Sequence, residues 1–206
     1  MTYASRLVKI PSIMTPGWLA PLLASFAVVA LAEMGDKTQL VALSLASRYR
    51  RPWIVMLGIL IATLLNHALA SSVGVWIGAR LPPAALGWLL GFGFIAFGVW
   101  TLFPDAPESP GAREGWGPLL STIVVFFLAE MGDKTQLATV ALGARFVSPV
   151  PVTLGTTLGM LAADSLAVFA GTRLAATTWM PTIRRIAAVL FFLFGLAAIA
   201  RARGFF

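Results

Sequence analysis

Long apolar segments alternate with short polar ones along the chain, and this pattern predicts an all-α polytopic membrane protein. Six apolar segments approach or exceed the roughly 20 residues that a helix needs to cross a bilayer. Basic or proline-containing turns separate them, and proline disfavours helix in the residue before it. The predicted transmembrane helices cover about residues 17–47, 53–79, 84–103, 118–146, 150–171 and 181–200.

One polar stretch interrupts this pattern twice. Residues 32–40 and residues 129–137 both read Ala-Glu-Met-Gly-Asp-Lys-Thr-Gln-Leu, each in the middle of an apolar segment. Because ionisable groups at bilayer depth are costly, they indicate a transport or ion site. The groups are Glu33, Asp36 and Lys37 in the first copy and Glu130, Asp133 and Lys134 in the second. Gly35 lies within the first copy and leaves open whether that helix is straight, kinked or broken there.

The duplication extends beyond the motif. At a spacing of 97 residues, the pairs are Ser25 with Thr122, Arg48 with Arg145, Pro52 with Pro149, Gly58 with Gly155, and His67 with Asp164. Each repeat holds three predicted helices, and an odd number reverses the chain, so we expect two inverted repeats that meet at a midplane site. The expected organisation is a leader (1–16), repeat 1 (17–103), a linker (104–117) and repeat 2 (118–206).

Composition excludes a soluble domain. The chain is 59% hydrophobic and 11% charged, whereas soluble domains are about a quarter charged. The net charge of +7 does not indicate nucleic-acid binding, because the arginines sit at the ends of apolar runs, where they contact lipid headgroups. Without cysteine there is no disulfide or thiolate metal site, and one histidine cannot build a zinc site.

Two features of the chain leave its placement in the membrane open. The N-terminal segment imitates a cleavable signal peptide, but an equivalent apolar run at 119–129 favours its retention. Six basic residues on the side of the termini stand against seven on the other side, which does not decide the orientation.

The motif's spacing suggests an oxygen-lined cation site. On a regular helix, residues three apart lie about 60° from each other, so each copy forms one carboxylate face. Two such helices crossing in antiparallel fashion would join four carboxylates and two amides, which suit Ca²⁺, Mg²⁺ or Mn²⁺. The expected ligands are Glu33, Asp36, Gln39, Glu130, Asp133 and Gln136, with Ser25 and Thr122 on the same faces. Thr38 and Thr135 point elsewhere unless the motif is unwound.

The charge balance favours exchange. Four carboxylates offset by Lys37 and Lys134 leave a formal charge of about −2, which one divalent cation or two protons would neutralise. The alternative is that Glu33–Lys37 and Glu130–Lys134 are internal ion pairs at helical spacing. His67 and Asp164 are candidates for a proton relay, with a helix-packing role for the histidine as the alternative.

The doubled Glu-φ-Gly-Asp-Lys-Thr motif resembles the calcium:cation antiporter-2 family, which includes bacterial manganese exporters and eukaryotic Golgi Ca²⁺/Mn²⁺–proton exchangers. The resemblance covers about residues 17–203. It implies that the four motif carboxylates bind the cation, and that Lys37, Thr38, Lys134 and Thr135 complete the motif.

The sequence therefore predicts an inner-membrane secondary transporter that exports Mn²⁺, or Ca²⁺, in exchange for protons. An exporter of a cationic metabolite such as a basic amino acid and a passive cation channel remain as alternatives; the motif lysines would repel the metabolite. No protease signature favours an enzyme, and no cofactor is expected. The expected partners are divalent cations, protons and the bilayer, with no nucleic acid, and a homodimer is left open.

Overall fold

The computed structural model describes residues 16–103, 116–170 and 180–204, and all regular structure in them is helical. The helices are α1 (Pro16–Glu33), α2 (Lys37–Tyr49), α3 (Pro52–Gly78), α4 (Pro83–Thr101), α5 (Pro118–Glu130), α6 (Lys134–Phe146), α7 (Pro149–Ala170) and α9 (Met180–Ala202). Nearly all of the expected leader and linker lies outside the described residues.

The two helices that carry the motif are broken. The expected helix over 17–47 is α1 followed by α2, with an angle of 75° between them. The expected continuous helix over 118–146 was wrong, because α5 ends at Glu130 and α6 begins at Lys134. The other four expected helices are confirmed to within a few residues as α3, α4, α7 and α9.

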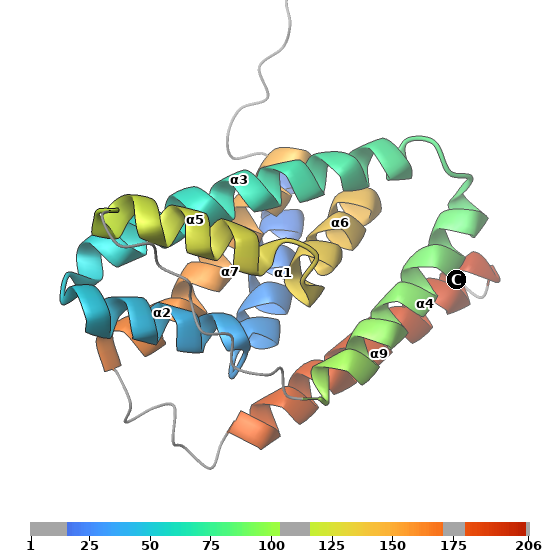
Figure 1. Ribbon diagram of the computed structural model, residues 1–206. Helices are drawn as coiled ribbons and strands as arrows, with labels where there is room; N and C mark the ends of the chain where they lie inside the picture. The colour runs from blue at the N-terminus through green and yellow to red at the C-terminus, as the bar shows by residue number, and fades with distance from the viewer. Residues whose placement is uncertain (1–15, 104–115, 171–179, 205–206) are drawn as a thin grey trace, which may run out of the picture.

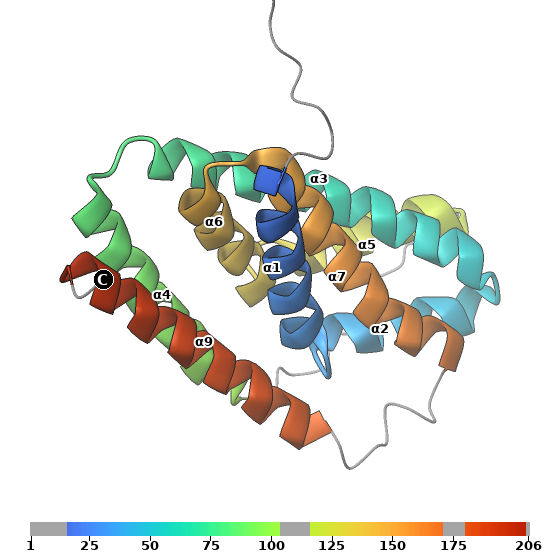
Figure 2. The same ribbon diagram turned by 180° about the vertical axis from the view of Figure 1, so that it is seen from behind.

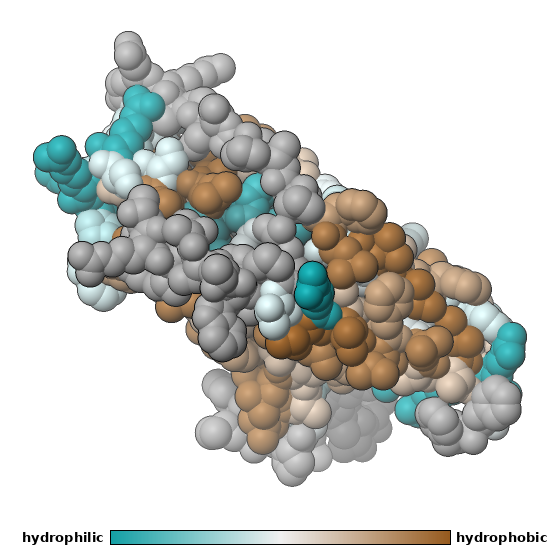
Figure 3. Space-filling model, turned by 90° about the horizontal axis from the view of Figure 1, so that it is seen from below, coloured by the Kyte–Doolittle hydropathy of each residue, from teal (hydrophilic) through white to brown (hydrophobic). Residues whose placement is uncertain are grey.

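The helices are suited to a bilayer. Four of them, α3, α4, α7 and α9, are long and apolar enough to cross a membrane, and the bent pair α1–α2 adds a fifth candidate span. Many large apolar side chains point outward, with Trp53 76% exposed and Leu19 58% exposed. Figure 3 shows a described surface dominated by apolar side chains, with most hydrophilic ones toward its ends. Lipid is the solvent that such a surface requires.

Helices α3 and α7 cross at the centre of the molecule, α5 lies beside α3 and α1 lies beside α7 (Figures 1 and 2). At the crossing, the Thr63 hydroxyl of α3 donates to the sulfur of Met160 in α7, at 3.3 Å. These two residues are 97 positions apart, so each contacts its own counterpart in the other half. The two halves of the chain therefore meet at equivalent positions.

Glycines allow equivalent close contacts between helices in the two halves of the chain. Gly58 of α3 faces Thr122 of α5, and Gly155 of α7 faces Ser25 of α1, each so closely that an added Cβ would collide. All four positions match at a spacing of 97 residues. The two halves are therefore built on the same internal contacts.

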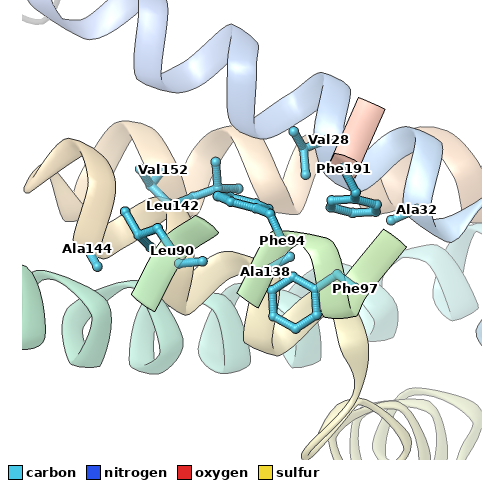
Figure 4. Close-up of a cluster of buried hydrophobic side chains, with 11 residues drawn as sticks. Val28, Ala32, Leu90, Phe94, Phe97, Ala138, Leu142, Ala144, Val152 and Phe191 are labelled. Atoms are coloured by element: carbon cyan, nitrogen blue, oxygen red, sulfur yellow. The ribbon is translucent and has the colours of Figure 1, made fainter. Parts of the chain in front are cut away.

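Helices α4 and α9 pack side by side as an antiparallel pair along one side of the other helices (Figures 1 and 2). A buried apolar cluster joins it to α1 and α6 (Figure 4). In this cluster, Phe94 of α4 stacks on Phe191 of α9 with ring centroids 6.2 Å apart. Val28 of α1 and Leu142 of α6 belong to the same cluster. The α4–α9 pair is thus attached to one helix from each motif break, α1 and α6.

Candidate cation-binding site

Each motif begins with a helix end and a tight turn. The backbone at Gly35 and at Gly132 has φ of +79°, which is left-handed and favours glycine. The side-chain oxygen of Gln39 accepts a hydrogen bond from the Gly35 amide at 2.8 Å, and that of Gln136 does the same for Gly132 at 2.7 Å. The glycine and the glutamine of the motif therefore build the break between the helices.

The break changes the geometry expected for the carboxylates. Glu33 and Glu130 are the last residues of α1 and α5, while Asp36 and Asp133 occupy the N-cap positions of α2 and α6. The expected carboxylate stripe on a regular helix was therefore wrong. A carboxylate at a helix N-terminus is favoured by the helix dipole, so the break gives each aspartate a stabilising environment.

Three carboxylates from the two halves converge at one point. Glu33, Glu130 and Asp133 each offer an oxygen, and these oxygens all lie within 4.8 Å of one another. The three side chains are buried, and both glutamates are fully inaccessible. Each of the three also has one buried oxygen without a hydrogen-bond partner among the described residues. Three buried carboxylates that approach one another this closely are suited to bind one shared cation.

The fourth carboxylate, that of Asp36, pairs across the two halves. The Lys134 ammonium donates to Asp36 Oδ1 at 2.7 Å, and both side chains are buried. The Lys37 ammonium lies 3.9 Å from Asp133 Oδ1, which is the equivalent pair. The lysines thus reach the aspartate of the opposite repeat and connect the two broken helices.

Two threonines hold the glutamates in place. The Thr38 hydroxyl donates to Glu33 Oε2 at 2.5 Å, and the Thr135 hydroxyl donates to Glu130 Oε2 at 3.1 Å. The unwound motif brings these side chains back to the carboxylates, which a regular helix could not do. The other oxygen of each glutamate, Oε1, is buried without a hydrogen-bond partner among the described residues.

The other residues expected near the site lie around it. Ser25 and Thr122 lie at the contacts with Gly155 and Gly58, eight residues before the motif glutamates, or about 12 Å along a helix. The Thr122 hydroxyl donates to the carbonyl of Pro118 in its own helix. The structure does not bring these two hydroxyls to the carboxylate cluster.

The glutamine amides anchor the motifs to the crossing helices. Gln39 Nε2 donates to the carbonyl of Ala163 in α7 at 2.8 Å, and Gln136 Nε2 donates to Asn66 Oδ1 in α3 at 3.3 Å. Asn66 in turn donates to the carbonyl of Phe127 at 3.0 Å. The only sign in the sequence of this link between Asn66 and the second motif is its position 97 residues before Ala163, whose carbonyl binds Gln39.

His67 and Asp164 directly follow these two anchor positions. Both are fully buried, and neither the imidazole nitrogens nor the carboxylate oxygens have a hydrogen-bond partner among the described residues. They lie on opposite crossing helices, each one turn beyond the Thr63–Met160 contact. No described hydrogen bond or ion pair links the two directly.

Comparisons with known proteins found a matching family model and several relatives. The family model described as "Divalent cation/proton antiporter GDT1" matches residues 21–109 and 118–204. A Vibrio cholerae protein named "Putative manganese exporter" is 43% identical over 180 residues, which cover 87% of this chain and 90% of that protein. A GDT1-like protein of Synechocystis sp. is 28% identical over 204 residues, covering 87% of this chain and 97% of its own. No solved structure matches the chain. These matches confirm the resemblance carried by the doubled motif.

Proposed function

Because the chain belongs to the GDT1 family of divalent cation/proton antiporters, we propose that its buried carboxylate cluster binds the exported cation. The ligands are Glu33, Glu130 and Asp133, with Asp36 as the fourth carboxylate of the site. The observation that carries the proposal is that three buried carboxylates from both repeats bring oxygens within 4.8 Å of one another, and each of them has an oxygen without a hydrogen-bond partner among the described residues. Such a set is costly in a bilayer unless a cation or protons occupy it.

The charge of the cluster explains the exchange. Four carboxylates and two lysines leave about −2, so either one divalent cation or two protons neutralise the site. The two loads exclude each other because they use the same oxygens. A site that is neutral in both loaded forms and charged when empty favours transport of a load in each direction.

Mn²⁺ is the cargo that we assign, with Ca²⁺ as the second candidate. Carboxylate and carbonyl oxygens suit Mn²⁺, Ca²⁺ and Mg²⁺, and the site includes no thiolate. The name of the Vibrio cholerae relative, a manganese exporter, favours Mn²⁺. We also propose that this multi-pass membrane protein lies in the inner membrane of the cell.

We further propose that α1–α2 and α5–α6 each act as one broken span, which gives six spans in two inverted repeats. The self-contact at Thr63 and Met160 and the matched glycine contacts support this arrangement. Broken helices that carry the site at a repeat interface are typical of secondary transporters. In this arrangement the glutamines hold the breaks, the threonines orient the glutamates, and His67 and Asp164 serve as a proton relay beside the site.

Transport into proteoliposomes tests this function. An outwardly directed proton gradient should drive Mn²⁺ uptake by the purified protein, and Glu33→Gln or Asp133→Asn should abolish it. The control is Ser165→Ala, which removes an exposed hydroxyl that donates within its own helix. Uptake that ignores the pH gradient would indicate a channel, and arginine or lysine flux without competition by Mn²⁺ would indicate a metabolite exporter.

A further inference from the structure

A groove runs along the seam where helices α4 and α9 pack against α1 and α6, and we call it the α4–α9 groove. It consists of three neighbouring cavities, whose volumes are about 420, 240 and 180 Å³ in order along the groove. The first and second share Leu90, Arg145, Ala198 and Arg201, and the second and third share Ala24, Val28 and Phe194. Shared lining residues make the three cavities one groove.

The groove is cationic at one end and apolar at the other. Arg145 at the end of α6 and Arg201 at the end of α9 line the first two cavities. The third cavity is lined only by apolar side chains, among them Leu31, Leu190 and Phe191. Both arginine side chains are exposed, and the ion pairs found among the described residues involve other cations. An amphipathic ligand with an anionic head matches this gradient.

We propose that the α4–α9 groove is a binding site for one anionic phospholipid. Its phosphate binds the guanidinium groups of Arg145 and Arg201, and an acyl chain follows the apolar cavities past Val28 and Phe194. Arginine is suited to phosphate because its planar fork donates two parallel hydrogen bonds. Basic pockets between transmembrane helices bind anionic lipid headgroups.

A general interfacial role does not explain the groove. Any arginine at the C-terminal end of a helix is stabilised by the helix dipole, and its side chain can snorkel to the lipid headgroups. Arg48 shows that role alone: it is the repeat counterpart of Arg145, near the end of α2, and stacks over Tyr49 at 5.8 Å as Arg145 stacks over Phe146 at 5.7 Å. Arg48 does not line the groove. The two arginines therefore separate a specific lipid site from generic attraction.

Other occupants fit the groove less well. Residues 1–16 of this chain carry Arg6 and Lys9, whose charge would repel the groove arginines. A second copy of the chain would have to bring an anionic side chain on an apolar surface, and acidic residues in the described segments are buried at the carboxylate cluster or in α7. A lipid supplies both the negative head and the apolar tail.

The site lies against the helices that bear the motifs. The groove follows α1 as far as Leu31, two residues before Glu33, and contacts α6 at Leu142 and Arg145. A lipid in the groove would contact the α4–α9 pair on one side and α1 and α6 on the other, so it would stabilise the packing between them.

Native mass spectrometry of the full chain, released from nanodiscs of equal parts phosphatidylglycerol and phosphatidylcholine, tests the proposal. We expect the wild-type protein and Arg48→Gln to retain one phosphatidylglycerol. The double variant Arg145→Gln/Arg201→Gln should reduce this retention about tenfold, and Arg145→Lys/Arg201→Lys should restore part of it. Ala24→Phe fills the groove without changing a charge and should also expel the lipid, which keeps the test valid if the glutamine variant fails to fold.

Three outcomes would overturn the proposal. The first is equal retention of phosphatidylcholine and phosphatidylglycerol by the wild-type protein. The second is equal loss of lipid in the Arg48 and Arg145/Arg201 variants, which would show generic headgroup attraction. The third is a lipid-free dimer that Ala24→Phe separates, which would assign the groove to a second copy. Because the readout is lipid retention, none of these outcomes depends on transport.

Discussion

Two glycines set the ends of the motif helices. Gly35 and Gly132 adopt left-handed backbone, where a side chain on Cβ costs about 1–2 kcal/mol per residue. Nothing lies within 4 Å of a Cβ built at Gly132, so the backbone alone resists substitution there. The nine-residue motif thus contains its own helix break as well as the carboxylates proposed as ligands.

Substituting Gly132 isolates this backbone effect. Gly132→Ala should destabilise the protein by about 1–2 kcal/mol and weaken Mn²⁺ binding, because the strain displaces Glu130 and Asp133 together. Thermal unfolding and Mn²⁺ titration of the purified protein measure the two effects. Gly93→Ala is the matched control: that glycine also has open space at Cβ but lies within α4, where alanine should be neutral or stabilising. Equal effects at both glycines would contradict the explanation.

The Thr38 hydroxyl positions Glu33 through one hydrogen bond to a carboxylate. Thr38→Val keeps the side-chain shape and removes the donor, so Mn²⁺ affinity should fall roughly tenfold or more, since bonds to charged groups contribute about 1.5–3 kcal/mol. Thr38→Ser keeps the hydroxyl and should retain most of the affinity. Calorimetric titration of the three proteins gives the comparison; a valine variant that binds like wild type would remove Thr38 from the site.

At the scale of elements, the two broken spans are joined by crossed ion pairs. Lys134 at the start of α6 holds Asp36 at the start of α2, and Lys37 faces Asp133 in the reverse sense. Helical spacing suggested pairs within each copy, and the structure adds links between the copies. The lysines therefore connect the two halves in addition to offsetting their charge.

A double-mutant cycle measures this connection. Lys134→Met leaves Asp36 without its 2.7 Å partner and should destabilise the protein by about 3–5 kcal/mol. Adding Asp36→Asn should recover much of that loss, because the uncompensated charge is then removed. Thermal stability in detergent at constant pH gives the coupling energy. Additive losses in the double variant would show that the pair does not act as a unit.

The sequence indicates the candidate site residues more directly than it indicates the backbone that holds them. Glu33, Glu130 and Asp133 were expected from composition at bilayer depth, since burial of a charge is informative whatever the local conformation. The break at Gly132 was missed because the apolar residues on both sides of the motif together fit one long helix. The roles of Gln39 and Asn66 depend on contacts with α7 and α3, which no spacing within one helix reveals.

At the scale of the whole molecule, protons and cation compete for one charge. Binding of Mn²⁺ should release about two protons, because the ligands must be deprotonated to bind a metal. Affinity should therefore fall as pH falls, and Glu33→Gln should release about one proton fewer. Calorimetry of Mn²⁺ binding in buffers with different protonation enthalpies counts the released protons. A count near zero in the wild-type protein would contradict exchange at a shared site.

The contact between Thr63 and Met160 has a consequence for how the two halves could diverge. In an assembly of two identical half-length chains, this position would have to fit against itself, and every substitution would appear twice. Fusion into one polypeptide removes that constraint. Threonine can then face methionine, and four residues further on, a histidine in one half can stand where the other half carries an aspartate. Joining the halves is thus what permits an antiporter with a symmetric scaffold to hold an asymmetric interior.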